Sequence, residues 1–204
     1  MNNCYLDAEA VITFFRMTGR KHIFITGSRG SGKSHLVNNM LKHMSDSFNL
    51  LQSHRTDTPQ VVIKSNLVAD NKEFVIGVPR TSGINPASKG NNMTIIEDGF
   101  INCAIPAIDT HLDTTPERLF VIDELGYLES SCIPFQKAVE KLLDNSHVLA
   151  VIRKQSTEFL NRICNRKDVL VIDIDSTFET LSCIIMASGM SKRFGSNKLI
   201  TDFN

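Results

Sequence analysis

Apolar residues recur with two different periods along this chain. Helical spacing predicts helices in four places, over Asp7–Met17, Lys33–Met44, Pro134–Leu143 and Thr157–Asn165. Short, continuous apolar runs predict buried strands at His22–Thr26, Leu119–Ile122, Val148–Ile152 and Val169–Ile174. Fully apolar strands that alternate with helices are typical of a parallel sheet covered on both faces. We therefore predict an α/β fold with a mainly parallel sheet.

The middle of the chain, Asn49–Pro116, follows a different pattern. Short β-type runs predict strands at Val61–Ile63, Phe74–Val78, Thr94–Ile96 and Phe100–Ile105. Between them, Pro79–Asn92 is rich in Pro, Gly, Ser and Asn, which predicts one long mobile loop. We expect hairpin strands to extend the parallel sheet here.

A glycine-rich turn separates the first predicted strand from the second predicted helix. It reads Gly27-Ser28-Arg29-Gly30-Ser31-Gly32-Lys33-Ser34 and fits G-x-x-x-x-G-K-[ST]. The glycines let backbone N–H groups approach phosphate oxygens, and the helix that follows directs its positive end at them. In such a loop Lys33 would reach the β- and γ-phosphates, and the Ser34 hydroxyl would bind Mg²⁺. The pattern predicts a P-loop that binds a nucleoside triphosphate with Mg²⁺.

Two adjacent acids follow another predicted strand. Asp123 and Glu124 come directly after Leu119–Ile122, so they lie at the carboxyl end of the strand, where open α/β sheets bind ligands. Asp123 would hold Mg²⁺, directly or through water. Glu124 would polarise an attacking water as general base. The pair favours hydrolysis over kinase chemistry.

Hydrolysis also requires compensation of the charge that develops in the transition state, often by an arginine. Arg153 is the first candidate, because it follows the predicted strand Val148–Ile152 and so belongs to the same edge of the sheet. Arg29, Arg80 and Lys154 are alternatives.

Composition narrows the function classes further. Apolar residues make up 42% and charged residues 22%, and 22 basic side chains balance 22 acidic ones. A neutral chain has no overall field to attract nucleic acid or an anionic membrane, so we expect neither as a partner. The five cysteines are dispersed, which disfavours a disulfide framework and a zinc site. With no signal peptide and no long apolar run, we expect a cytoplasmic protein.

The two phosphate-site motifs together resemble the THEP-type nucleoside-triphosphatases, small P-loop proteins of the ASCE group. The carrying residues are Gly27–Ser34 and the block Val121–Glu129, in which Asp-Glu-Leu-Gly-Tyr-Leu-Glu is similar to the family's D-E-I-G-x-M-E. The resemblance covers roughly residues 20–175. It implies hydrolysis of nucleoside 5′-triphosphates such as ATP, GTP or CTP to diphosphate and phosphate, with broad base specificity and Mg²⁺ as cofactor. Where the family usually has a second Thr after the P-loop hydroxyl residue, this chain has His35, which we include in the nucleotide-binding set.

The last stretch, Cys183–Leu199, looks like the opening motif of the MobA-like nucleotidyltransferases. The residues that match A-x-G-x-S-x-R-[FM]-G-x-x-K are Gly189, Ser191, Arg193, Gly195 and Lys198. We therefore predict a P-loop NTPase domain over residues 1–178, followed over residues 179–204 by the first strand and phosphate loop of an incomplete nucleotidyltransferase domain. The resemblance implies a missing C-terminal transferase domain, or other molybdenum-cofactor machinery, as a partner.

Three functions remain open at this stage, and a kinase is a further alternative. The lead is an Mg²⁺-dependent NTPase. The second is the accessory NTPase half of a molybdenum-cofactor nucleotidyltransferase. The third is a slow nucleotide-gated switch, for which the predicted loop Pro79–Asn92 is the motivation.

Overall fold

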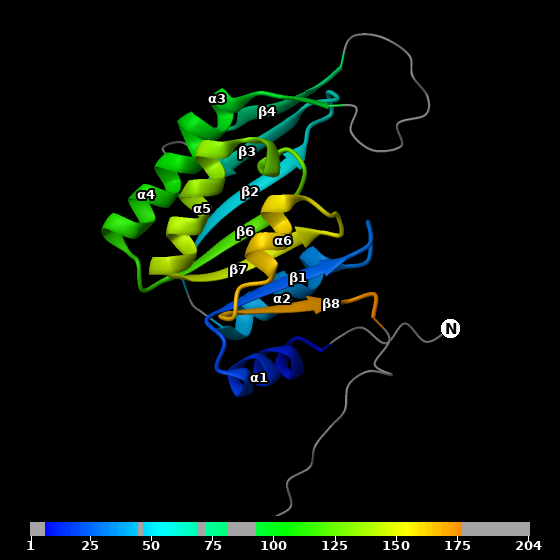
Figure 1. Cartoon of the computed structure of the whole chain (residues 1–204), viewed down its shortest axis with the longest axis vertical. Coiled ribbons are helices and arrows are strands. Elements are labelled where there is room, and N and C mark those ends of the chain that lie inside the picture. Colours follow the sequence, from blue (N-terminus) through cyan, green and yellow to red (C-terminus); the bar gives the residue numbers. More distant parts are fainter. Residues whose placement is uncertain (1–6, 45–46, 69–71, 81–92, 177–204) are drawn as a thin grey trace, which may run out of the picture.

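The structure is a computed structural model that describes residues 7–44, 47–68, 72–80 and 93–176 (Figure 1). The strands are β1 (His22–Gly27), β2 (Phe48–Arg55), β3 (Val61–Ser65), β4 (Phe74–Pro79), β5 (Met93–Ile95), β6 (Leu119–Leu125), β7 (His147–Arg153) and β8 (Val169–Asp173). The helices are α1 (Ala8–Thr18), α2 (Lys33–Met44), α3 (Glu97–Gly99), the π-helix η2 (Phe100–Ala104), α4 (Ile105–Thr114), the 3₁₀-helix η3 (Glu129–Ser131), α5 (Ile133–Asn145) and α6 (Glu158–Cys164).

All eight strands form one sheet in the order β5-β4-β3-β2-β6-β7-β1-β8. The pairs β2–β6, β6–β7, β7–β1 and β1–β8 are parallel, whereas β2–β3, β3–β4 and β4–β5 are antiparallel. The prediction of a mainly parallel α/β sheet extended by hairpin strands is confirmed. Strand β7 lies between the phosphate-loop strand β1 and the acidic strand β6. Because the three strands are parallel, their carboxyl ends lie at the same edge of the sheet.

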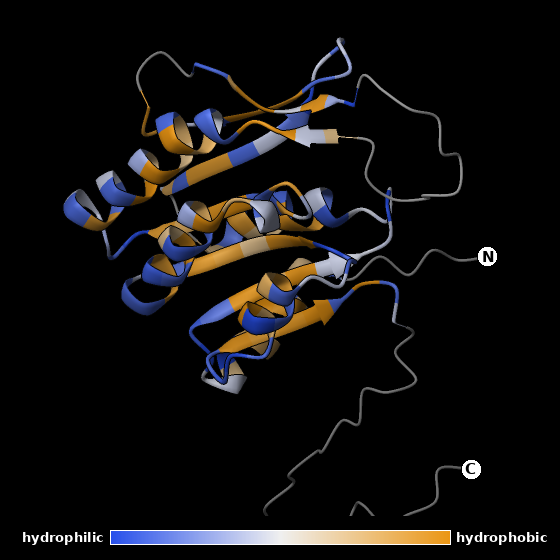
Figure 2. Ribbon diagram, turned by 45° about the horizontal axis from the view of Figure 1, so that its top comes forward, coloured by the Kyte–Doolittle hydropathy of each residue, from blue (hydrophilic) through white to orange (hydrophobic). Residues whose placement is uncertain are grey.

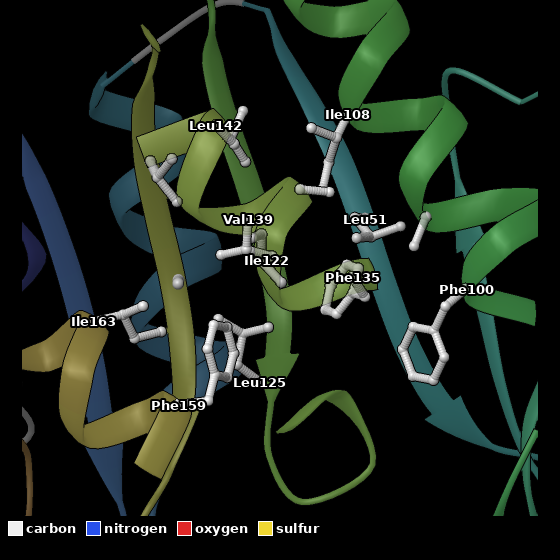
Figure 3. Packing of buried hydrophobic residues seen from close by; sticks show 14 of the residues in the cluster. Leu51, Phe100, Ile108, Ile122, Leu125, Phe135, Val139, Leu142, Phe159 and Ile163 are labelled. Carbon is white, nitrogen blue, oxygen red and sulfur yellow. The ribbon is translucent and has the colours of Figure 1, made fainter. Parts of the chain in front are cut away.

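Two apolar layers, one on each face of the sheet, explain why the parallel strands are apolar throughout. Alternate residues of β1 enter different layers: Phe24 packs toward α5 and α6, whereas Ile23 and Ile25 pack toward α1 and α2. In Figure 2 the apolar colour is concentrated in the central strands and the polar colour on the outer faces of the helices. Figure 3 shows the first layer, in which Phe135 of α5 and Phe159 of α6 lie over β6 and β7. These layers fix the central strands on which the site depends.

One predicted strand is wrong. Residues Phe100–Ile105 form helix instead, continuous with α3 and α4 from Glu97 to Thr114. The reason is spacing over a longer window: Phe100, Cys103, Ala104, Ala107 and Ile108 are all buried, which is helical periodicity that a six-residue apolar run conceals.

Strand β2 is an element that the apolar pattern missed. Its sequence, Phe-Asn-Leu-Leu-Gln-Ser-His-Arg, has Asn as its second residue and four polar residues at its end, so it contains no long apolar run. Buried Asn49 is tolerated because its side-chain amide is hydrogen-bonded. Its Nδ2 donates to the Thr115 hydroxyl at 2.8 Å and pairs with His111 Nδ1, also at 2.8 Å. The missed strand is the one that joins the antiparallel part of the sheet to β6.

In the part of the chain that the structure describes, no helix is long and apolar enough to cross a membrane. Cys103, Cys132 and Cys164 are free thiols. Residues 81–92 of the predicted loop and the tail residues Gly189, Arg193 and Lys198 lie outside the described residues.

Candidate nucleotide site

A cavity of about 600 Å³ opens at the carboxyl edge of the sheet, at the ends of β1, β2, β6 and β7. It is lined by the P-loop, by the ends of three strands and by the turn after β7. The lining residues are Gly27, Ser28, Arg29, Gly30, Gly32, Lys33, Ser34, His35, Arg55, Glu124, Arg153, Lys154 and Gln155. The lining therefore combines backbone N–H groups, one carboxylate and five cationic side chains. That combination suits a polyanion.

The glycines of the loop meet two different needs. Gly30 and Gly32 have φ of 77° and 93°, a left-handed conformation that side chains with a Cβ rarely adopt. At Gly27 the need is space, since an added Cβ would lie 2.7 Å from Ile174 Cγ1 and 2.8 Å from Ser31 Oγ. The loop could not take this path with ordinary residues at these positions.

The loop is anchored at its start by an acid from beyond β8. The Asp175 carboxylate accepts hydrogen bonds from the Ser28 N–H at 2.6 Å and from the Ser28 hydroxyl at 3.0 Å. Lys154 Nζ in turn contacts Asp175 at 3.1 Å and Asp173 at 2.8 Å. Lys33 Nζ donates to the carbonyl oxygens of Gly27 at 3.0 Å and Ser28 at 2.8 Å. Charged side chains therefore hold the loop in place, Asp175 at its start and Lys33 at its end.

Asp123 is half-buried and is not among the residues that line the cavity. Burial and the neighbouring Glu124 charge raise the pKa of Asp123, and hydrogen bonding to Gln52 and Ser34 lowers it, with the raising effects dominant. The Ser34 hydroxyl and the Asp123 carboxylate are therefore close enough to share one ion. Hard oxygen ligands of this kind suit Mg²⁺, which takes one or two protein ligands plus phosphate and water. No cluster of three or more His, Cys, Asp or Glu side chains occurs among the described residues, so a larger all-protein metal cage is absent there.

Glu124 faces the cavity and forms an ion pair with Arg153, the last residue of β7, through the guanidinium Nε. The strand β6 changes register against β7 between Asp123 and Leu125, so Glu124 lies at an irregularity in the ladder. Arg153 passes directly over Gly126, where an added Cβ would lie 2.7 Å from Arg153 Cδ. The absence of a side chain at Gly126 makes room for this arginine.

Glu129, the last acid of the Val121–Glu129 block, has a structural position. Its side chain is buried, and its Oε2 accepts a 2.9 Å hydrogen bond from the Gly126 N–H. Burial raises the pKa of Glu129, an effect that the nearby Arg153 charge opposes. Ser130 adds a 2.6 Å hydrogen bond to the Gly126 carbonyl. Together these bonds fix the turn over which Arg153 lies.

The structure brings most of the sequence-predicted site residues into one cavity. Of the predicted set, Ser31 and Asp123 stay off the lining: Ser31 closes the loop with a 2.7 Å bond to the Ser28 carbonyl. Arg80, an alternative for the transition-state arginine, is exposed at the end of β4 and is not part of the lining. His35 lines the cavity, and its Nε2 pairs with Asn39 Nδ2 at 3.1 Å.

Sequence reasoning missed Arg55 and Gln155. Gln155 directly follows Lys154, so its position beyond β7 was a usable signal. Arg55 ends a strand that the apolar pattern did not reveal, so the sequence offered no comparable signal.

Comparison with known proteins places this arrangement in a family. The family model described as NTPase matches residues 22–179. Nucleoside-triphosphatase THEP1 of Thermotoga sp. (strain RQ2) is 26% identical over 155 residues, which cover 75% of this chain and 86% of that protein. The THEP1 of Thermotoga maritima is 23% identical over 154 residues, with 75% and 86% covered.

Two solved structures share the fold. The crystal structure of THEP1 from the hyperthermophile Aquifex aeolicus has a TM-score of 0.59 and 18% identity, and the match covers 75% of this chain and 89% of that one. The solution structure of a human cancer-related nucleoside triphosphatase has a TM-score of 0.54 and 19% identity, with 75% and 88% covered. The P-loop, the acid pair at the end of β6 and these matches lead to one conclusion: the chain belongs to the NTPase family, of the THEP1 type.

Proposed function

We propose that this protein hydrolyses nucleoside 5′-triphosphates to diphosphate and phosphate, with Mg²⁺ as cofactor and broad base specificity across ATP, GTP and CTP. The observation that carries the proposal is Glu124, a carboxylate on the wall of the same cavity as the P-loop and next to a candidate Mg²⁺ ligand. The names of the THEP1 relatives support the same reaction.

The P-loop would bind the phosphates of the nucleotide. Its N–H groups and the start of α2 receive the phosphates, and Lys33 exchanges its contacts with loop carbonyls for contacts with the β- and γ-phosphates. Ser34 and Asp123 would hold Mg²⁺, which supplies neutralisation of charge on the β- and γ-oxygens when bound. Arg29 and His35 lie at the rim of the same cavity.

Catalysis would need a water positioned by Glu124. In the structure this carboxylate pairs with Arg153, so the two side chains neutralise each other. A triphosphate in the cavity offers the guanidinium a second anionic partner. Arg153 would then stabilise the transferring phosphoryl group, while Glu124 accepts a proton from the attacking water.

The test is phosphate release from ATP, GTP and CTP by wild type and by Glu124→Gln. We expect release from all three nucleotides by wild type, and nucleotide binding with little turnover by the variant, because an amide cannot accept the proton. Glu117→Gln is the matched control: this exposed acid precedes β6 at the opposite edge of the sheet. Wild-type protein that releases no phosphate from any nucleotide would contradict the proposal.

Two alternatives make different predictions. A nucleotide-gated switch would bind triphosphate and diphosphate with different affinities and show negligible turnover. A kinase would place the phosphate on an acceptor instead of releasing it into solution.

We also propose that residues 179–204 begin a nucleotidyltransferase-type segment after an NTPase domain at residues 1–178. The second candidate function, the accessory NTPase half of a nucleotidyltransferase, requires this arrangement. Its support is the residue pattern alone, with Gly189, Arg193 and Lys198 as phosphate-contacting residues. With the P-loop disabled by Lys33→Ala, nucleotide binding that persists and is then removed by Arg193→Ala would support this segment. Absence of residual binding would count against it.

A further inference from the structure

We infer that Arg55, at the end of β2, contacts the γ-phosphate of a bound nucleoside triphosphate and compensates the charge that develops as this phosphoryl group passes to water. The inference rests on the proposed hydrolytic function and adds a catalytic residue to it. It is carried by the position of Arg55, by the fixed backbone beneath it and by the lack of an ion-pair partner for its guanidinium among the residues that the structure describes.

The position is set by the pairing of β2 with β6. These strands are parallel, with Gln52 opposite Asp123, so the next residues of β2 lie beside Glu124. The Ser53 hydroxyl lies 3.4 Å from the Glu124 carbonyl oxygen and 3.5 Å from its N–H. Since side chains alternate along a strand, Arg55 leaves β2 on the same side as Ser53, one step nearer the mouth of the cavity. Arg55 therefore lines the cavity on the Glu124 side.

Arg55 and Glu124 end the two strands of the site that lie farther from the P-loop, since the sheet order is β2-β6-β7-β1 and the loop follows β1. The phosphates enter against the loop and the start of α2, while the candidate base Glu124 stands at the end of β6. In an in-line displacement the attacking water and the γ-phosphate lie between these two walls. A cation on the Glu124 wall can reach the γ-phosphate without competing for the loop side of the triphosphate.

Among the described residues, the Arg55 side chain has no hydrogen-bond or ion-pair partner, whereas three other cations on the lining have such partners. Arg153 pairs with Glu124, Lys154 pairs with Asp173 and Asp175, and Lys33 donates to loop carbonyls. Within the described residues, the side chains of Arg55 and Arg29 have no hydrogen-bond or ion-pair partner. Arg29 belongs to the loop itself, so among the described residues Arg55 is the unpaired cation on the Glu124 side of the cavity.

The backbone under Arg55 is held in place by a hairpin. Arg55 pairs with Val61 of β3, and the turn between them is closed by a 3.2 Å bond from the Thr56 N–H to the Gln60 carbonyl. The Thr56 hydroxyl adds a 2.8 Å bond to the Thr58 carbonyl. A long side chain on a fixed strand end can reach a ligand while its Cα stays in position, and such positioning reduces the entropy lost in the transition state.

The experiment compares Arg55→Ala, Arg55→Lys and wild type in phosphate release at saturating nucleotide and Mg²⁺. An arginine that stabilises the transferring phosphoryl group is worth roughly 10³ to 10⁵ in kcat, so we expect Arg55→Ala to lose at least about 100-fold. Arg55→Lys keeps the charge but not the fork of donors, and should recover part of the loss. Added guanidinium ion should raise the kcat of Arg55→Ala. Arg118→Ala is the matched control, since Arg118 is exposed just before β6 at the opposite edge of the sheet.

Affinities separate a catalytic role from a structural one. Measured in a Glu124→Gln background, which prevents turnover, Arg55→Ala should weaken ATP binding while leaving ADP affinity within about threefold, because the missing contact is to the γ-phosphate. Equal kcat for Arg55→Ala and an active wild type would overturn the role of Arg55 and leave the proposed function standing. An equal loss of ATP and ADP affinity would also overturn it, since that result indicates a disturbed cavity. A wild type without phosphate release would instead refute the proposed function itself.

Discussion

Gly126→Ala is a one-methyl change that tests whether the position of Arg153 matters for catalysis. The added Cβ would lie 2.7 Å from Arg153 Cδ, 3.2 Å from Cγ and 3.3 Å from Nε. Nothing in the backbone opposes the change, because Gly126 is not among the glycines with a positive φ. The methyl group therefore acts on the side chain that pairs with Glu124.

The expected loss of kcat follows from these distances. Carbon atoms in contact prefer a separation of about 3.5 to 4.0 Å, so the Arg153 stem must move by roughly 1 Å. A misplacement of about 1 Å can cost on the order of 100-fold in rate, and we expect kcat of Gly126→Ala to fall by about 10- to 100-fold. Stability should change little, because Arg153 is a flexible, half-exposed side chain that can swing aside.

The assay is a double-mutant cycle on kcat, with Arg153→Ala and the double variant beside Gly126→Ala. If the methyl group acts only by displacing the arginine, Gly126→Ala should not lower kcat further in the Arg153→Ala background. The two losses of kcat will then not add. Thermal unfolding of all four proteins serves as the control for folding.

Two results would contradict a role for the position of Arg153 in turnover. If Gly126→Ala retains wild-type kcat, the exact placement of Arg153 is irrelevant to turnover. If the methyl lowers kcat equally in the Arg153→Ala background, it acts elsewhere, for example through the Gly126 N–H bond to Glu129.

Two further predictions concern stability and the metal. Buried His22 accepts a 3.2 Å bond from the Val148 N–H, and burial lowers its pKa from 6.5 to about 4. Between these values the unfolded chain binds a proton that the folded chain does not, so stability falls as pH drops, by about 2 kcal/mol at about pH 5. Urea unfolding of His22→Asn should lack this part of the pH dependence, and an unchanged pH profile would exclude His22 as its source. Ser34→Ala removes a candidate Mg²⁺ ligand and should raise the Mg²⁺ concentration for half-maximal phosphate release by at least about tenfold; an unchanged Mg²⁺ titration would argue against that role.

Local patterns in the amino-acid sequence were enough to predict the chemistry of the loop and the class of the fold. The spacing Gly27–Ser34 needs no tertiary information, because its residues act through their own backbone and the helix that follows. The position of the acid pair Asp123–Glu124 could also be predicted, because the end of a fully apolar run marks the end of the strand. The same local logic predicted the parallel strands, which are apolar because helices cover both faces.

The side chains that contact those motifs could be identified only from the three-dimensional fold. Strand β2 was hidden because its polar residues are satisfied by distant partners, such as Asn49 by His111, and Arg55 was hidden with it. The helix at Phe100 was missed because a short apolar run does not distinguish helix from strand. The pairing of Glu124 with Arg153 over Gly126 joins residues 29 positions apart in sequence. Such contacts depend on strand order and register, which local patterns of hydrophobicity do not specify.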